Sequence, residues 1–198
     1  MWAERCPALL ASALRRGELF FASRLQHTKV FDLSGRQVGT LQDLVVSVQQ
    51  EYPPVTSLIL KLFHHNQPKK VSWRQVLSFE ESEIFLSCRL EQIEDHPQPD
   101  TDHELWLIKE VLDKQIVDTE GRKLIRVQDI QLARVNGNIR VMAVDISTHA
   151  ILRRLGLGFL SERLGSRMTP HFIDWSNVNL VSSKVPKVSL KVSLEKLG

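Results

Sequence analysis

The 198-residue chain lacks the residues and segments that mark several large classes of protein. It has only two cysteines, Cys6 and Cys88, which form no disulfide framework and have no metal-ligand spacing. We expect both to be buried or incidental thiols in a reducing compartment. No apolar run approaches the roughly 18 residues of a membrane span, and the start, MWAERCPALLASALRR, is an inadequate signal peptide because charges interrupt it. These absences predict a cytoplasmic protein that would reach the inner face of a membrane only through a partner.

Motifs for catalysis or cofactor binding are also missing. Gly156 and Gly158 lack a third glycine and do not follow a strand, so they form no dinucleotide-binding turn. His64 and His65 lie in a polar turn with no cysteine and no further histidine nearby, and the serine and histidine residues of the chain show no nucleophile signature. We therefore predict that the chain is not an enzyme and has no catalytic residue, no cofactor, no metal site and no small-molecule substrate.

Composition is that of an ordinary globular protein, with 42% hydrophobic and 25% charged residues and a net charge of +3. That charge is too small to imply nucleic acid binding by itself. The charges are segregated, however. Residues 80–104 contain nine acids against one base, Arg89, whereas residues 134–171 contain six arginines against two acids.

A 17-residue stretch occurs twice, as VFDLSGRQVGTLQDLVV at residues 30–46 and as IVDTEGRKLIRVQDIQL at residues 116–132. The offset is 86 residues throughout (118 − 32), and the polar matches are Asp32 with Asp118, Gly35 with Gly121, Arg36 with Arg122, and Gln42-Asp43 with Gln128-Asp129. Such a repeat predicts two similar domains. We interpret Asp32 and Asp118 as turn-forming residues rather than a catalytic pair, because Asp opens and Gly closes a type I turn.

Short strand-like runs separated by turn signals fill both copies, a pattern typical of small β-sandwiches and barrels. The runs expected as strands in the first copy are Leu19–Ser23, Lys29–Asp32, Thr40–Gln50, Thr56–Phe63, Val71–Val76 and Glu83–Ser87. In the second copy we expect a helical turn followed by a strand in Leu105–Leu112, a hairpin in Ile116–Val127, and strands Asp129–Val135 and Ile139–Ser147 around an Asn-Gly turn. Trp73 and Trp175 are expected to be core or rim aromatics.

The acidic segment 91–104 is expected to be a solvated linker. His96 and His103 among its aspartates could hold a metal weakly, but a flexible loop does not preorganise ligands. We divide the chain into an N-terminal extension (1–17), a first domain (18–90), the linker (91–104), a second domain (105–193) and the start of a C-terminal region (194–198).

The copies differ most in residues 148–171. Trp73 and Trp175 are 102 residues apart (175 − 73), so the second copy holds 16 additional residues (102 − 86). We predict one or two short helices there, and a partner-binding surface formed by Arg153, Arg154, Arg163 and Arg167. Three interpretations remain open: a solvated helix face, a dock for an acidic protein surface (the chain's own linker or a second copy included), and an RNA or anionic-lipid surface.

The repeated unit resembles the PRC-barrel family, the small β-barrel of the photosynthetic reaction centre H subunit that is also found in the ribosome maturation factor RimM. The resemblance rests on residues 30–36, Val38-Gly39 and Asp43 in the first copy, on residues 116–122, Val127 and Asp129 in the second, and on the closing Val-Ser-Trp and Ile-Asp-Trp. Ile125 stands where the family often has glycine.

The resemblance implies an all-β protein of two tandem small PRC-like β-barrels, the second with a short helical insert. Tandem PRC barrels with such an insert, followed by a sequence such as residues 192–197, are similar to the N-terminal part of proteins that continue into an MgtE-type magnesium transporter intracellular domain. The implied function is a non-catalytic protein-interaction (adaptor) or regulatory module that would be linked to magnesium transport. The alternative is a RimM-like ribosome- or RNA-associated factor, although that factor pairs one PRC barrel with a different barrel.

Overall fold

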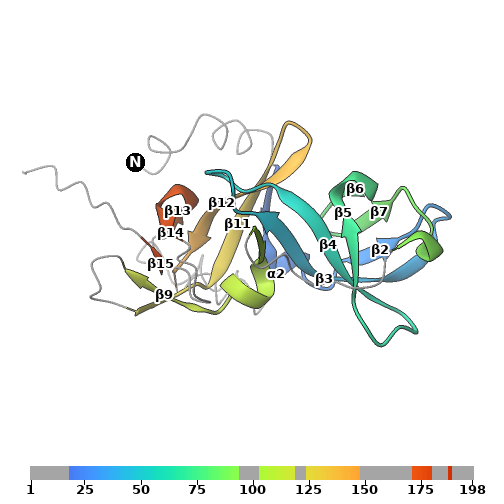
Figure 1. The fold of residues 1–198 in the computed structure, drawn as a ribbon, viewed down its shortest axis with the longest axis horizontal. Helices are drawn as coiled ribbons and strands as arrows, with labels where there is room; N and C mark the ends of the chain where they lie inside the picture. Colours follow the sequence, from blue (N-terminus) through green and yellow to red (C-terminus); the bar gives the residue numbers. More distant parts are fainter. Residues whose placement is uncertain (1–17, 94–102, 119–123, 148–170, 180–186, 189–198) are drawn as a thin grey trace, which may run out of the picture.

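The computed structural model describes residues 18–93, 103–118, 124–147, 171–179 and 187–188 (Figure 1). β-strands dominate these residues and the helical segments are single turns, which confirms the all-β class. In the described residues the sheets do not close on themselves, so a closed barrel is not confirmed. None of the described helices is long and apolar enough to cross a bilayer.

Half one, residues 28–93, forms a sheet in the order β5-β4-β3-β2-β7-β6. Its elements are β2 (Lys29–Phe31), β3 (Gln37–Ser47), β4 (Val55–Leu62), β5 (Lys69–Ser72), the 3-10 helix η1 (Trp73–Gln75), β6 (Val76–Phe79), β7 (Glu83–Leu86) and the 3-10 helix η2 (Leu90–Gln92). Leu58, Leu60 and Leu62 place one face of β4 in the core. Ile59, on the other face, is buried against Val45 and Trp106.

Half two, the described residues from 114 onwards, contains elements in nearly the same order, except that two strands correspond to β3 and no described element corresponds to η2. The elements of half two are β9 (Gln115–Asp118), β10 (Leu124–Arg126), β11 (Asp129–Val135), β12 (Asn138–Asp145), β13 (Phe172–Asp174), the 3-10 helix η4 (Trp175–Asn177), β14 (Val178–Asn179) and β15 (Lys187–Val188). They lie in two sheets, one in the order β10-β9-β15-β14 and the other containing β11, β12 and β13.

The repeat seen in the sequence continues into the register of the strands. In half one the pairing of β3 with β4 slips between Val45 and Val46. In half two the pairing of β11 with β12 slips between Gln131 and Leu132, which is 86 residues later (131 − 45). The halves therefore share a backbone irregularity as well as a motif.

The segments around the two equivalent tryptophans turn a corner. We expected one strand over Val71–Val76, but β5 ends at Ser72, whose side chain accepts a hydrogen bond from the Arg74 N–H and starts η1. Asp174 starts η4 in the same way by accepting from the Ser176 N–H. Trp175 is buried and Trp73 packs on Phe79, as predicted for core and rim aromatics.

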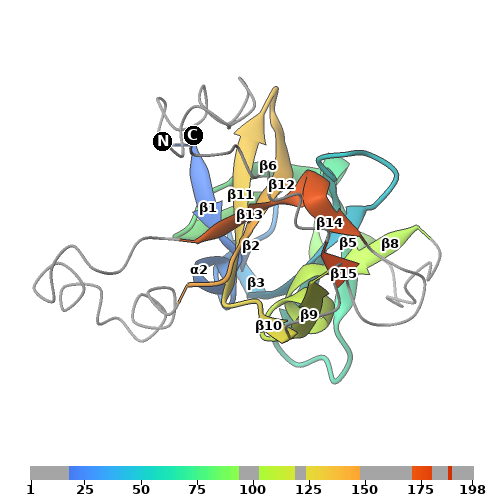
Figure 2. The ribbon, with the colours of Figure 1, turned by 90° about the vertical axis from the view of Figure 1, so that its left-hand side faces the viewer.

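Each half is preceded by a leading segment that pairs with the other half. Leading segment one (18–27) contains β1 (Leu19–Phe21) and α2 (Ala22–Leu25), and β1 pairs with β11 of half two (Figure 2). Leading segment two (103–113) contains β8 (Glu104–Trp106) and the π-helical turn η3 (Leu107–Val111), and β8 pairs with β3 of half one. The expected order for residues 105–112 was wrong, because the strand precedes the helical turn. Glu104, assigned to the linker, begins β8.

The two halves share one core and a local twofold relationship. A single cluster of buried side chains contains Leu44 and Leu58 of half one together with their equivalents Ile130 and Val144 of half two. An isolated antiparallel bridge joins Pro54 to Arg140, which are equivalent at the offset of 86 (140 − 54). A bridge between equivalent residues lies on a pseudo-twofold axis, so the halves pack as the subunits of a symmetric dimer do.

Candidate functional site

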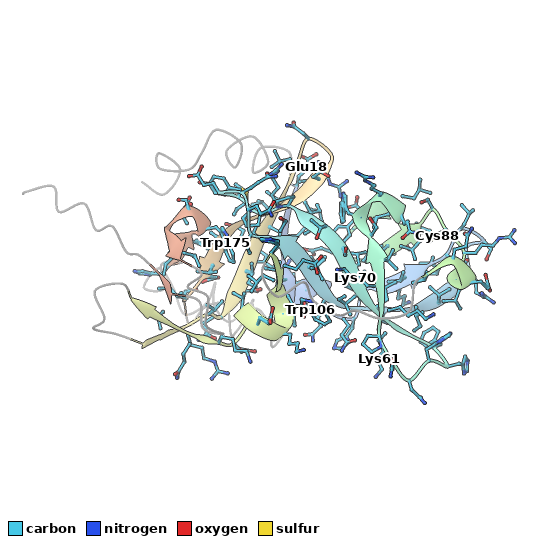
Figure 3. All side chains as sticks on the ribbon, viewed as in Figure 1. Glu18, Lys61, Lys70, Cys88, Trp106 and Trp175 are labelled. Atoms are coloured by element: carbon cyan, nitrogen blue, oxygen red, sulfur yellow. The ribbon has the colours of Figure 1, made fainter. Side chains whose placement is uncertain are left out.

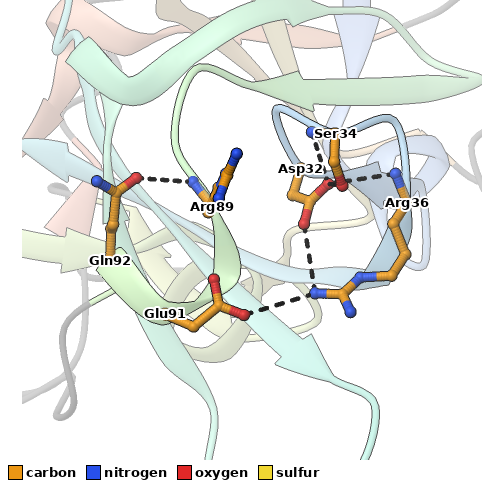
Figure 4. A network of polar contacts seen from close by, with 6 residues as sticks. All are labelled: Asp32, Ser34, Arg36, Arg89, Glu91 and Gln92. Atoms are coloured by element: carbon orange, nitrogen blue, oxygen red, sulfur yellow. Dashed lines mark hydrogen bonds and ion pairs between the residues drawn. The ribbon is translucent and has the colours of Figure 1, made fainter.

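Asp32 organises the hairpin between β2 and β3 (Figure 4). Its carboxylate accepts hydrogen bonds from the Ser34 N–H and hydroxyl and from the Arg36 N–H, and Gly35 has a φ of 78°. The hydrogen bond from the Ser34 hydroxyl is the main cause that lowers the pKa of Asp32, against the effect of burial. The Arg36 guanidinium also pairs with Asp32 and with Glu91. The predicted turn role is confirmed for Asp32, and the side chain of Asp118 lies outside the described residues.

Asp43 and Asp129, the second repeated pair of acids, fasten the leading segments. Asp43 of half one accepts hydrogen bonds from the N–H groups of Ile108 (2.8 Å) and Lys109 (2.9 Å) at the start of η3. Asp129 of half two accepts from the N–H (3.1 Å) and hydroxyl (2.6 Å) of Ser23 in α2. Each aspartate thus caps a helical turn that leads into the opposite half. Burial raises the pKa of Asp43, and the N–H groups that it binds oppose the shift.

These contacts assign structural roles to three carboxylates of the repeated motif, those of Asp32, Asp43 and Asp129. Within the described ranges no group of three or more His, Cys, Asp or Glu side chains is placed to hold a metal ion. Cys88 is buried, as expected, and burial raises the pKa of its thiol. Cys6 falls outside the described residues. The repeat therefore encodes a scaffold, and a functional surface is to be sought where the halves differ.

Arg153, Arg154, Arg163 and Arg167 lie outside the described residues, as does the insert from residue 148 to residue 170. The ends of the insert are adjacent, because the Ile146 N–H donates to the His171 carbonyl (3.0 Å) where β12 meets β13.

An aromatic surface on half one was missed at the sequence level. Phe31 on β2 stacks on Phe85 on β7, with ring centroids 5.0 Å apart and an interplanar angle of 19°. Phe63 follows β4, and its N–H donates to the Val38 carbonyl beside the position where Phe31 pairs with Gln37. Phe63 is 48% exposed. These residues therefore form a row across four strands on the face of the sheet that points away from the core.

Apolar and basic side chains border this row. Leu33, two residues after Phe31, is 57% exposed at the hairpin. One row further along the strands lie the exposed Lys29 and Lys61, and Figure 3 shows Lys61 at the opposite end of the molecule from Trp175. We call the set Phe31, Leu33, Phe63, Phe85, Lys29 and Lys61 the aromatic face.

The aromatic face has no counterpart in half two. The register positions equivalent to Phe31 and Phe85 carry Val117 and Lys187, which pair in the parallel ladder of β9 and β15. A comparison of the copies at offsets of 86 (117 − 31) and 102 (187 − 85) would have revealed the difference from sequence alone. The feature of the sequence that reveals this surface is the position of the two phenylalanines. Each lies next to a buried aliphatic residue on its strand, so that it points outward while the aliphatic residue points into the core.

An open cleft of about 360 Å³ lies between the β3–β4 loop and η4. Beside it the Tyr52 hydroxyl donates to Asp174 (3.1 Å), and burial together with this carboxylate raises the pKa of Tyr52 to about 12. The residues that line the cleft are Val48, Gln49, Gln50, Glu51, Trp175, Ser176 and Val178. This lining joins the β3–β4 loop of half one to η4 and β14 of half two.

No known family model matches the chain, and no curated protein sequence matches it either. The resemblance to the PRC-barrel family therefore stays a prediction that rests on the motif residues alone.

Proposed function

We propose that this chain is a non-catalytic protein-interaction module in which the repeated residues build the scaffold and the aromatic face of half one contacts a partner protein. The observation that carries the proposal is that the stacked pair Phe31 and Phe85 occurs in half one only. The equivalent positions of half two hold Val117 and Lys187. A role in folding would be expected to recur in both halves, as the roles of Asp43 and Asp129 do.

The exposure of the aromatic face supports the same conclusion. Phe63 and Leu33 keep about half of their surface in solvent, although covering a large apolar side chain stabilises a protein or complex by roughly 1.5–3 kcal/mol. Contiguous apolar side chains with a charged border are typical of protein contact sites, where aromatic residues dominate the binding energy.

The PRC-barrel resemblance implies the same class of function, and we extend the proposal to an adaptor of two PRC-like units linked to magnesium transport. The shared register and the shared slip of the two halves support the tandem arrangement. They disfavour the RimM-like alternative, whose two barrels would differ.

Site-specific photo-crosslinking tests the proposal. p-Benzoylphenylalanine would be introduced in separate variants of the full chain at Phe63, at Leu77 and at Arg154, and irradiated in cells. Leu77 is the matched control, because it is 70% exposed and apolar but lies on β6 outside the aromatic face. We expect a discrete protein adduct from position 63 and none from position 77.

Two results would contradict the proposal. Adducts of equal yield from positions 63 and 77 would indicate non-specific apolar contact. A discrete adduct from position 154 without one from position 63 would move the binding surface to the arginine-rich insert.

A further inference from the structure

We infer that the aromatic face binds an acidic amphipathic helix of a partner protein, an inference that rests on the proposed function and specifies its partner. The strand registers arrange the face in two parallel rows. The first row crosses β6, β7, β2 and β3 at Ser78, Phe85, Phe31 and Gln37, and Phe63 lies beyond β3 at the end of β4. The second row crosses β7, β2, β3 and β4 at Glu83, Lys29, Thr40 and Lys61.

The charges in the second row favour an acidic ligand. Among the residues that the structure describes, no acidic side chain lies within ion-pair distance of Lys29 or Lys61. Two neighbouring bases are already neutralised, since Arg36 pairs with Asp32 and Glu91 and Lys70 pairs with Glu104. Within the second row, the two lysines therefore carry positive charge that is available to a ligand. Glu83, directly opposite Lys29, ends the row with a negative charge.

The spacing of the rows fits a helix laid across the strands. Phe31 and Phe63 stand two strands apart, as do Lys29 and Lys61, and two strand spacings are about 10 Å. Residues i and i+7 of a helix are separated by about 10.5 Å. The rows are two residues apart along the strands, or roughly 7 Å. A helix of about 10 Å diameter can therefore place an apolar stripe on the phenylalanines and acids on the lysines.

Two synthetic helical peptides provide the probe. Both carry the same leucine stripe at i, i+3 and i+7, and the residues that flank the stripe are glutamate in one and glutamine in the other. Binding to the full chain is measured by titration with amide chemical shifts as the readout. We expect the glutamate peptide to bind about fivefold more tightly at low salt, with shifts confined to β2, β3, β4 and β7, and to lose that advantage at high salt.

Variants separate the two rows. Phe63→Ser should abolish binding of both peptides, whereas Lys61→Glu should remove only the preference for the glutamate peptide. Lys114→Glu is the matched control, because it reverses an exposed lysine of half two and should leave both affinities unchanged.

Several outcomes would overturn the inference. Equal binding of both peptides would remove the acidic character of the partner and leave the proposed function standing. Shifts in half two would place the acidic site elsewhere. Self-association of the chain that Phe63→Ser abolishes would identify a second copy as the occupant, and co-sedimentation with phosphatidylserine vesicles through the same residues would identify a membrane. Failure of the proposed function is distinct, because it would appear as the absence of an adduct from position 63.

Discussion

Asp32 and Asp43 belong to one repeated motif, yet their carboxylates have different partners. Asp32 binds groups two and four residues away, so its role follows from local turn chemistry. Asp43 binds the Ile108 N–H, 65 residues away, and Asp129 binds Ser23, 106 residues away. The pattern of residue types around an aspartate does not indicate which distant N–H or O–H group will donate to it. The first role could therefore be predicted from sequence and the second could not.

Replacing Asp32 by Asn tests the charge in the hairpin. The pKa of Asp32 is lowered on folding, so its ionised form contributes stability above the unfolded pKa of about 3.9 and that contribution is lost as the pH falls. We expect Asp32→Asn to lower the free energy of unfolding by about 1 kcal/mol at pH 7, and by less as the pH approaches 3. Urea unfolding across this range measures the difference.

Glu91→Gln is the matched control for that substitution. It removes the exposed partner of Arg36 and should change stability little at any pH. A difference between Asp32→Asn and the parent chain that does not vary with pH would show that hydrogen bonding alone, without ionisation, stabilises the hairpin.

Among the elements, α2 and η3 are equivalent turns of different pitch. The Gln26 N–H donates to the Ala22 carbonyl four residues back, whereas the Leu112 N–H donates to the Leu107 carbonyl five residues back. The offset between the copies accordingly changes from 85 at the leading strands (106 − 21) to 86 beyond the turn (113 − 27). The additional residue therefore lies between Leu107 and Val111, because these two take the buried positions of Ala22 and Leu25. The π-helical turn accommodates a one-residue insertion.

Deletion of Glu110 should convert η3 into an α-helical turn like α2. The buried positions and the cap from Asp43 are retained, and the main loss is the hydrogen bond from the Trp106 N–H to the Glu110 carboxylate, so we expect a cost of about 1 kcal/mol. Deletion of Val111 is the comparison, and it should cost about 3 kcal/mol because it removes a buried side chain. Thermal unfolding of both deletions checks the ranking, which equal costs would contradict.

There is also a physical reason why the second copy has Ile125 where the first copy has Gly39. A Cβ on Gly39 would lie 2.2 Å from the Lys61 carbonyl oxygen, since β4 pairs with β3 as far as Leu62. β12 ends at Asp145, the equivalent of Ile59, and pairs with β11 rather than β10. Among the described residues no strand therefore crosses the position of Ile125 closely, and a side chain is tolerated there.

At the scale of the whole molecule, the sequence predicted the all-β class, the repeat, most strands and the place of the insert. It did not predict that β1 and β8 pair with the opposite halves. Alternating patterns determine which face of a strand is buried, but β1 would be equally amphipathic beside either half. The aromatic face was missed for a related reason. Phe31 and Phe85 look like core residues until the register shows that Val30 and Ile84 take the inward positions.

The exchanged leading segments and the shared core predict that both halves unfold together. Calorimetry of the parent chain should give one transition whose calorimetric and van't Hoff enthalpies agree. Asp43→Ala leaves the Ile108 and Lys109 N–H groups without their acceptor, which costs about 3 kcal/mol and lowers the Tm of a chain of this size by about 8 °C. Asp129→Ala should lower the Tm of the same single transition, because the substitution removes the hydrogen bonds that hold α2 to half two. If the halves were independent, each substitution would instead split the trace into one shifted and one unshifted transition. A single shifted transition in both variants would therefore show that the two halves fold as one body.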